Sequence, residues 1–177
     1  MDKNKILDNL IMKVANYDTE AMEEFYAMTR TSVYGFALSI VKNHHKAEDI
    51  MQDSYIKIFE NASRYVSQNK PMAWILTIVK NLSLSTLDHT SEKEFGLEED
   101  RISGDRAFSD SIIDKVFLEE VLTNLTREEG QIIILNAVVG MKHREIATLL
   151  RLPLSTSLSK YHRALSKLRK ILKEEAN

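Results

Sequence analysis

The chain has 177 residues, of which 44% are hydrophobic and 28% charged, and its formal net charge is −2. This length allows one medium domain or two small ones, and the scarcity of glycine and proline favours an all-α fold. The lack of cysteine excludes disulfides and thiolate chemistry. Because there is no signal-peptide core and no apolar run of about 20 residues, we expect a cytoplasmic protein without membrane insertion.

Three helices are expected in the first half. Apolar positions recur at helical spacing over residues 20–42 and again from about 46 to 62. The inward face of the second of these helices is expected at Ala47, Ile50, Met51, Ser54, Ile58 and Ala62. A polar loop, SRYVSQNKP, follows, and Pro71 suits the first turn of a third helix. Since three helices can bury one another, residues 1–87 are expected to form a small domain.

The second expected helix carries another column of residues beside its apolar face. This column consists of Asp49, Gln52, Asp53 and Ile56. An exposed isoleucine flanked by carboxylates is more typical of a docking face for a basic protein partner than of an idle surface. The alternative is a merely solvated acidic face.

Other chemistry is weakly signalled. His44 and His45 each have a carboxylate four residues further on, but no other cluster of histidines and carboxylates completes a metal shell. A histidine pair near a helix start is therefore favoured, and no metal site is expected. Nothing resembles a phosphate-cradling glycine loop or a nucleophile–base pair, so we expect neither enzymatic activity nor a cofactor.

The middle of the chain is acidic and lacks periodicity. Residues 88–114 carry nine acidic and three basic side chains, with two glycines within nine residues. Such a composition is typical of a flexible linker, which we expect at 88–112. The alternative is a partly helical segment packed on the rest of the protein.

Helical signals return in the second half, and residues 113–177 are expected to form the second domain. Thr126 and Glu129 have the spacing of a capping box, which predicts the start of a very apolar helix. Gly140 stands where the end of that helix favours a left-handed residue. A short helix follows and is broken before Pro153, because the residue that precedes a proline is pushed out of helical geometry.

The last segment has the pattern of a helix-turn-helix. Residues 141–173 carry nine basic side chains against the single acid Glu145. A short helix, a break of about four residues and a longer basic helix let the first helix brace the second in a DNA groove. The apolar column of the long helix is expected at Leu154, Leu158, Tyr161, Leu165 and Leu168. The residues left to face base edges and phosphates are Ser155, Thr156, Ser159, Lys160 and Arg163.

Two alternatives to DNA binding exist for this helix. It could serve packing alone, or it could lie on a membrane surface. A membrane-surface helix would carry bulky aromatic residues on its apolar face, where only Tyr161 is found. DNA binding is favoured, since a local excess of eight positive charges is what a polyanion senses within a Debye length.

Four segments together resemble the extracytoplasmic-function (ECF) type of bacterial RNA polymerase sigma factors, in the sigma-70 family. These are KAEDIMQDSYIKIF, PMAWILTIVKNL, LTREEGQIIILNAVVGMKHREIATLL and the run from Pro153 to Leu165. Each is weak alone, but their order and spacing are specific. The resemblance covers about 18–87 and 113–173 and implies a non-enzymatic initiation factor with two helical domains.

The resemblance also implies partners and residue roles. Asp49, Gln52 and Asp53 match the helix that docks on the clamp helices of the largest polymerase subunit, and the flap is a second contact. The loop at about 64–70 matches the segment that captures a flipped base of the minus-10 element. The positions carried over to minus-10 recognition are Arg64, Asn69, Lys70, Trp74, Lys80 and Asn81. The helix from Ser155 onward matches the reader of the minus-35 element, and an anti-sigma factor would be a natural regulator.

The chain departs from the family pattern in several places. Basic residues usually follow Asn81, but here the sequence is LSLSTLDHT. An aliphatic residue and a cation usually stand where this chain has Ser157 and Leu158, so we expect the buried stripe to avoid 157. Arg151 replaces the usual turn glycine and Lys142 a capping serine or threonine. The alternatives are an autonomous helix-turn-helix regulator and a sigma-derived adaptor with degenerate DNA binding.

Overall fold

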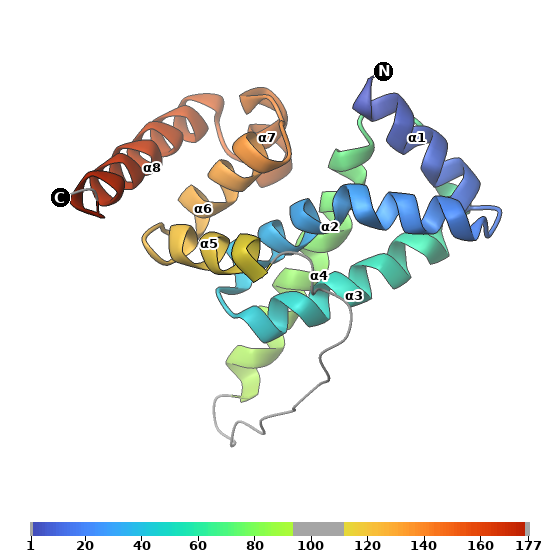
Figure 1. The fold of residues 1–177 in the computed structure, drawn as a ribbon, viewed down its shortest axis with the longest axis horizontal. Coiled ribbons are helices and arrows are strands. Elements are labelled where there is room, and N and C mark those ends of the chain that lie inside the picture. The colour runs from blue at the N-terminus through green and yellow to red at the C-terminus, as the bar shows by residue number, and fades with distance from the viewer. Residues whose placement is uncertain (1, 94–111, 176–177) are drawn as a thin grey trace.

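The computed structural model describes residues 2–93 and 112–175, and within these ranges every regular element is a helix. The all-α class is therefore confirmed. In Figure 1, α1–α4 form one half of the molecule and α5–α8 the other, and α2 lies against both. The α-helices are α1 (Lys3–Val14), α2 (Thr19–Val41), α3 (His44–Asn61), α4 (Pro71–Lys93), α5 (Ile112–Thr123), α6 (Arg127–Ile133), α7 (His143–Leu150) and α8 (Leu154–Glu175).

The first half begins with a helix that the sequence analysis missed. Asp2 caps α1 by accepting a hydrogen bond from the backbone N–H of Asn4 at 3.1 Å. The buried side chains of α1 are Leu7, Asp8, Leu10, Ile11 and Val14. Their spacing of three and four residues is itself a helical signal. This half is consequently a bundle of four helices.

The other helices of this half begin and end near the expected positions. α2 ends where Lys42 turns left-handed, with φ of 55°, and Asn43 caps α3 by accepting from the N–H of Lys46 at 2.9 Å. Pro71 opens α4, as expected. The six residues of the predicted inward face are all buried; five lie in α3, and Ala62 lies in the short 3-10 turn that follows it. The periodicity therefore predicted the orientation of α3 correctly.

The linker was expected to begin at residue 88, but the helix before it is longer than expected. α4 continues to Lys93. Its burial also continues, because the Ser83 hydroxyl donates to the Val79 carbonyl at 2.8 Å inside the core and Leu87 packs against the same core. The apolar stripe thins out before the helix ends, which is why the sequence pattern fades early. The rest of the predicted linker, 94–111, lies outside the described residues.

In the second half, α6 begins as predicted. Thr126 and Glu129 form the capping box: the Thr126 N–H donates to Glu129 Oε2 at 3.0 Å, and the Glu129 N–H donates to the Thr126 hydroxyl. Past Ile133 the helix widens into a π-turn, η3 (Ile134–Val138), and it ends before Gly140, which has φ of 84°. The expected continuous helix is thus an α-helix followed by a π-turn.

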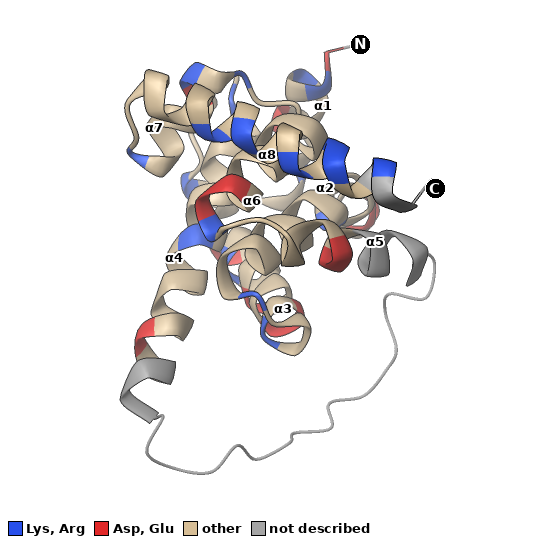
Figure 2. Ribbon diagram, turned by 90° about the vertical axis from the view of Figure 1, so that its left-hand side faces the viewer, with Lys and Arg blue, Asp and Glu red and all other residues tan. Residues whose placement is uncertain are grey.

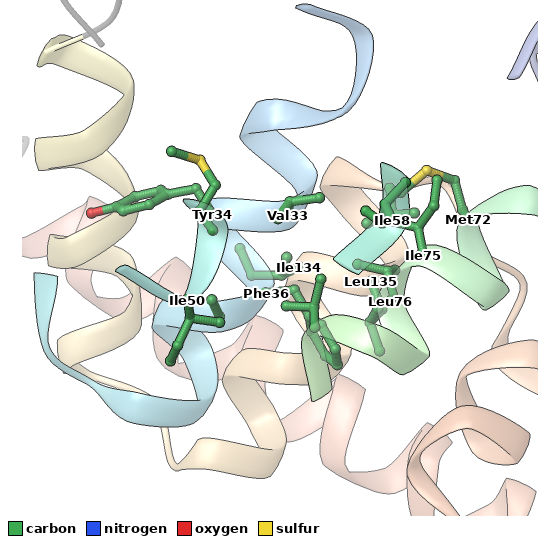
Figure 3. Packing of buried hydrophobic residues seen from close by; sticks show 14 of the residues in the cluster. Val33, Tyr34, Phe36, Ile50, Ile58, Met72, Ile75, Leu76, Ile134 and Leu135 are labelled. Carbon is green, nitrogen blue, oxygen red and sulfur yellow. The ribbon is translucent and has the colours of Figure 1, made fainter. Parts of the chain in front are cut away.

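The two halves share one hydrophobic core. Ile134 and Leu135 of η3 belong to the same buried cluster as Val33 and Phe36 of α2 and Leu76 of α4, as Figure 3 shows. A Cβ on Gly35 would lie 3.5 Å from the Ile134 side chain, an ordinary van der Waals distance, so η3 packs directly on α2 at this position. Two small domains joined by a linker were expected, and the structure packs their cores together.

The orientation of α8 corrects one prediction. The buried stripe was expected to include Leu154 and to avoid Ser157. Instead, Ser157 is fully buried, as is Ala164, whereas Leu154 is 36% exposed. The helix therefore keeps residue 157 inward, because its small side chain lets α8 lie close to its neighbours, and Leu158 stays only half-buried. In the described part of the chain, the Ser157 hydroxyl has no hydrogen-bond partner.

Candidate functional site

The column on α3 lies on the surface. Asp49, Gln52, Asp53 and Ile56 are all exposed, and Ile56 exposes 54% of its side chain. The opposite side of the helix is held inward by Ile50, Ser54 and Ile58. Within the described residues, neither Asp49 nor Asp53 forms an ion pair. This side of α3 therefore presents two carboxylates without an ion-pair partner in the described part of the chain, followed by an apolar side chain, a combination that suits a basic partner with an apolar contact point.

The loop between α3 and α4 is fixed by a residue outside it. Asp8 of α1 accepts hydrogen bonds from the hydroxyls of Tyr65 and Ser67, the latter at 2.7 Å. Burial of its ring and the hydrogen bond to Asp8 together raise the pKa of Tyr65. The Tyr65 ring also packs on Trp74, with ring centroids 4.8 Å apart. Sequence reasoning missed Asp8 because it overlooked α1.

Five of the six candidates for minus-10 recognition fall into two groups, and Asn69 belongs to neither. Arg64, Trp74 and Asn81 line a groove of about 360 Å³, together with Lys57 and Asn61 of α3. This groove offers a half-buried aromatic ring beside cations and amides, which suits an unstacked base and its phosphates. Asn69 is exposed at the loop tip, with a left-handed φ of 56°.

The other group faces the second half. Lys70 Nζ lies 3.6 Å from Glu145 of α7, and Lys80 Nζ donates to the Leu149 carbonyl at 2.7 Å. That carbonyl belongs to the C-terminal turn of α7, where the helix dipole favours a cation. Burial, together with the nearby Arg151 guanidinium, lowers the pKa of Lys80. In this arrangement both lysines are engaged by the second half.

A second lysine caps a helix across the same boundary. Lys42, at the end of α2, donates from Nζ to the carbonyls of Leu122 and Leu125, the latter at 2.9 Å. Burial lowers the pKa of Lys42, and Arg127 lowers it further. Both lysines, 42 and 80, therefore bind carbonyl oxygens at helix C-termini of the other half. Sequence reasoning missed Lys42, since no local motif indicates a contact about 80 residues away.

The basic face of α8 is partly engaged by α6. Lys160 Nζ lies 2.5 Å from Glu128 Oε2, and Lys167 Nζ lies 2.7 Å from Glu129 Oε2. Figure 2 shows the basic bands of α8 beside the acidic start of α6. Burial acts to raise the pKa of Glu129, but Lys167 and the Thr126 N–H outweigh it, so the net pKa is lowered.

The remaining residues of this face are more open. Ser155, Ser159 and Arg163 are exposed, whereas Thr156 and Lys160 are half-buried. The Arg163 Nε donates to the Ser159 carbonyl at 3.5 Å, which lays the guanidinium along the helix surface. Of the five residues predicted to contact the minus-35 element, Arg163 is thus the exposed cation, and Lys160 is the cation that is paired with a carboxylate.

The histidine pair lies at the start of α3, as expected from the sequence. His44, His45 and Glu48 place ligand atoms within 4.8 Å of one another. The His44 Nδ1 also lies 2.7 Å from the Tyr34 hydroxyl and 3.3 Å from Glu119 of α5. The positive end of the helix dipole disfavours a cation at this position. The cluster therefore supplies a polar contact between α3 and α5, and the prediction of no metal site stays a prediction.

Within the described residues, none of the helices combines the length and apolarity that a membrane span requires.

Comparisons with known proteins agree on both halves. The family model of Sigma-70 region 2 matches residues 25–91, and that of Sigma-70 region 4 matches 118–168. An ECF RNA polymerase sigma factor SigK of Mycolicibacterium vanbaalenii is 30% identical, over 94% of this chain and 89% of its own length. The SigK of Mycobacterium tuberculosis is 28% identical, over 94% and 93%.

Solved structures show the same fold. CnrH, in complex with the cytosolic domain of CnrY, has a TM-score of 0.63 and 18% identity, covering 96% of this chain and 98% of its own. The sigma factor RpoE from Bartonella quintana, in complex with the anti-sigma factor NepR, has a TM-score of 0.66 and 23% identity, covering 88% and 98%.

Proposed function

This chain belongs to the ECF group of the sigma-70 family and directs promoter-specific transcription initiation, and we propose which of its surfaces carries out each step. The exposed column of α3 docks on core RNA polymerase through the clamp helices of its largest subunit. The observation that carries this assignment is the unpaired state of Asp49 and Asp53 beside the exposed Ile56. The second domain adds a contact with the flap.

Promoter DNA is read at two places. The groove lined by Arg64, Trp74 and Asn81 takes an unstacked base of the minus-10 element, with Asn69 and Lys70 on the adjoining loop and Lys80 on the next turn of α4. The exposed side of α8 reads the minus-35 element in a major groove, with Arg163 as its principal cation. Ser155, Thr156, Ser159 and Lys160 complete that surface. We assign the chemistry of transcription to the polymerase and no catalytic step to this chain.

Reading both elements requires the halves to separate. The elements lie about 25 base pairs apart, which is about 85 Å of duplex. A compact chain of this length has a radius of gyration of only about 16 Å. The packed arrangement of Figure 1 is too small to span that distance, so we assign it to the factor before it engages a promoter.

The partners follow from this assignment. The protein acts in the cytoplasm, where core polymerase and promoter DNA are found. An anti-sigma factor is its proposed regulator, and the two similar structures, each with a regulator bound, support that proposal.

Single-round transcription with core polymerase on a randomised promoter library tests the function. We expect transcripts that depend on the chain and share two sequence blocks. Arg64→Ala should relax the downstream block, and Arg163→Ala the upstream block. Transcripts that need no added chain, or blocks that neither variant alters, would contradict the proposed reading surfaces. Tight, specific duplex binding without polymerase would instead favour an autonomous regulator.

A further inference from the structure

A cleft of about 400 Å³ lies between the two halves, where α4 faces α7. Its size falls within the range of small-molecule sites, which occur preferentially at domain interfaces. Lys70 and Lys80 line it from the first half, and Arg144, Glu145 and Arg151 from the second. The cleft is complete only while the halves are packed together, because each half supplies one wall.

The charge of this cleft is unbalanced. Among the described residues, four cationic side chains line it against the one carboxylate of Glu145. Glu145 already pairs with Lys70 and accepts a hydrogen bond from the Lys142 N–H at 3.0 Å. Arg144 and Arg151 form no ion pair within the described residues, and both are exposed. The nearness of Arg151 to Lys80 also lowers the lysine pKa, which is the effect of like charges held close together.

The backbone holds Arg151 in this crowded position. Arg151 has a left-handed φ of 55°, a conformation that suits glycine and costs other residues about 1 kcal/mol or more. An arginine at this turn therefore adds a cation to the cleft at the expense of stability. An anion with several charges would neutralise the cluster and accept hydrogen bonds from guanidinium groups, which favour phosphate geometry.

We propose that the cleft between α4 and α7 binds a small polyphosphate anion, such as pyrophosphate, tripolyphosphate or the phosphate chain of a nucleotide. Arg144 and Arg151 bind its phosphates from one wall and Lys80 from the other, and Asn81 also lines the cleft. The ligand bridges the halves and stabilises their packed arrangement. It consequently competes with promoter binding, a consequence that rests on the proposed function, whereas the binding itself does not.

Calorimetric titration of the full chain with pyrophosphate and tripolyphosphate tests the site. We expect saturable binding to one site, tighter for tripolyphosphate, and a ligand-dependent rise in Tm. The double variant Arg144→Gln/Arg151→Gln should weaken binding at least about tenfold, since each arginine supplies a charge-assisted contact. The control variant Arg169→Gln/Lys170→Gln removes the same charge from an exposed part of α8 and should bind as the wild type does.

A second measurement follows the two halves. Because the chain lacks cysteine, Glu24→Cys and Arg169→Cys place one dye on each half. Core polymerase and promoter DNA should lower the energy transfer between the dyes, and tripolyphosphate should oppose this drop in this protein, but not when Arg144→Gln/Arg151→Gln is also present. The variant Arg144→Gln/Arg151→Gln, without the cysteine substitutions, should still support transcription in the absence of ligand. Tripolyphosphate should inhibit transcription by this variant less than transcription by the wild type.

Several outcomes would overturn the proposal. Equal binding by the cleft variant and the control variant would place the anion elsewhere. Binding of a short single-stranded oligonucleotide without any binding of tripolyphosphate would make the cleft a nucleic-acid contact. Tripolyphosphate that binds but does not oppose the drop in energy transfer caused by polymerase and promoter would refute the bridging of the halves. A chain that binds tripolyphosphate but does not support transcription would refute the proposed function and leave the site intact.

Discussion

α3 and α8 are both amphipathic helices that present charged side chains to the surface, but they differ in what those side chains already contact. On α3, Asp49 and Asp53 form no ion pair within the described residues, and Ile56 is exposed about one turn beyond them. On α8, Lys160 and Lys167 pair with Glu128 and Glu129 of α6. Charge of similar density thus serves mainly an outside partner on α3 and partly the protein's own packing on α8.

The difference shows that a run of charge in a sequence counts potential contacts, whereas the structure shows which of them are already made. A carboxylate or an ammonium that is paired internally must lose that partner before it binds another. We therefore expect substitutions on α3 to act chiefly on association, and those on α8 to divide between stability and DNA binding.

The largest effect is expected for charge reversal on α3. Asp49→Arg/Asp53→Arg should weaken binding to core polymerase at least about 100-fold, because like charges at a docked interface repel. Competition binding with labelled wild-type chain measures this. Glu23→Arg/Glu24→Arg reverses two exposed acids of α2 and should bind normally. Equal loss in both variants would make the effect one of net charge and remove α3 from the interface.

The next effect tests whether the acidic partners of α8 are structural. Glu129→Ala removes the capping box and the partner of Lys167, and should lower the free energy of unfolding by about 2 kcal/mol. Denaturant unfolding at neutral pH measures it. Glu128→Ala, which removes only a surface pair, is the matched control and should cost less than about 1 kcal/mol.

Glu129 also predicts a dependence of stability on pH. Its pKa in the folded protein lies below the ordinary value of 4.5, so its charged form stabilises the fold at higher pH. That stabilisation is lost as the pH falls through the lowered pKa. The wild type should therefore lose more stability than Glu129→Gln as the pH falls from about 5 to about 3. Parallel losses in the two proteins would refute this role.

A smaller effect separates the two cations of α8 in promoter binding by the holoenzyme. Arg163→Ala should weaken it about tenfold, as expected for the loss of a groove contact. Lys160→Ala should cost less, since Lys160 is already paired with Glu128. Glu128→Gln releases Lys160 and should strengthen binding, whereas Glu120→Gln, on exposed α5 surface, should not. Weaker binding in Glu128→Gln would mean that the pair positions Lys160 for DNA.

The smallest effect concerns how α8 is seated. Ser157→Ala removes a buried hydroxyl without a partner and should raise the free energy of unfolding by about 1 kcal/mol. Ser166→Ala, at an exposed position of the same helix, reports the gain in helix propensity alone. The difference between the two variants isolates the buried hydroxyl. No difference would mean that Ser157 has a partner in solution.

Sequence periodicity predicted what depends on local spacing. The inward face of α3, the capping box at Thr126 and the left-handed Gly140 all follow from residues within one or two turns of each other. It failed at α8, where Ser157 is buried although it is polar, because close approach of the helices decides its position. A hydrophobicity pattern ranks leucine above serine and cannot sense that spacing.

Contacts between the halves lay beyond prediction for a related reason. Lys42 and Lys80 bind backbone carbonyls about 80 and 70 residues away, and a carbonyl oxygen has no sequence signature. Asp8 was missed although its helix carries a clear pattern in Leu7, Leu10, Ile11 and Val14. The residue roles on the polymerase and DNA surfaces came from family resemblance, and they stay predictions that the variants above test.

The partners of Lys42 and Lys80 have a consequence for ionic strength. Both lysines bind helix-end carbonyls at half-buried positions, whereas Arg163 would meet phosphates at an exposed surface. Dissolved ions screen exposed charges strongly and half-buried ion–dipole contacts much less. Added salt should therefore loosen promoter complexes, and the dyes on the two halves should then report a return to the packed chain. A rise in intracellular salt would thus release the factor from DNA and return it to the packed arrangement.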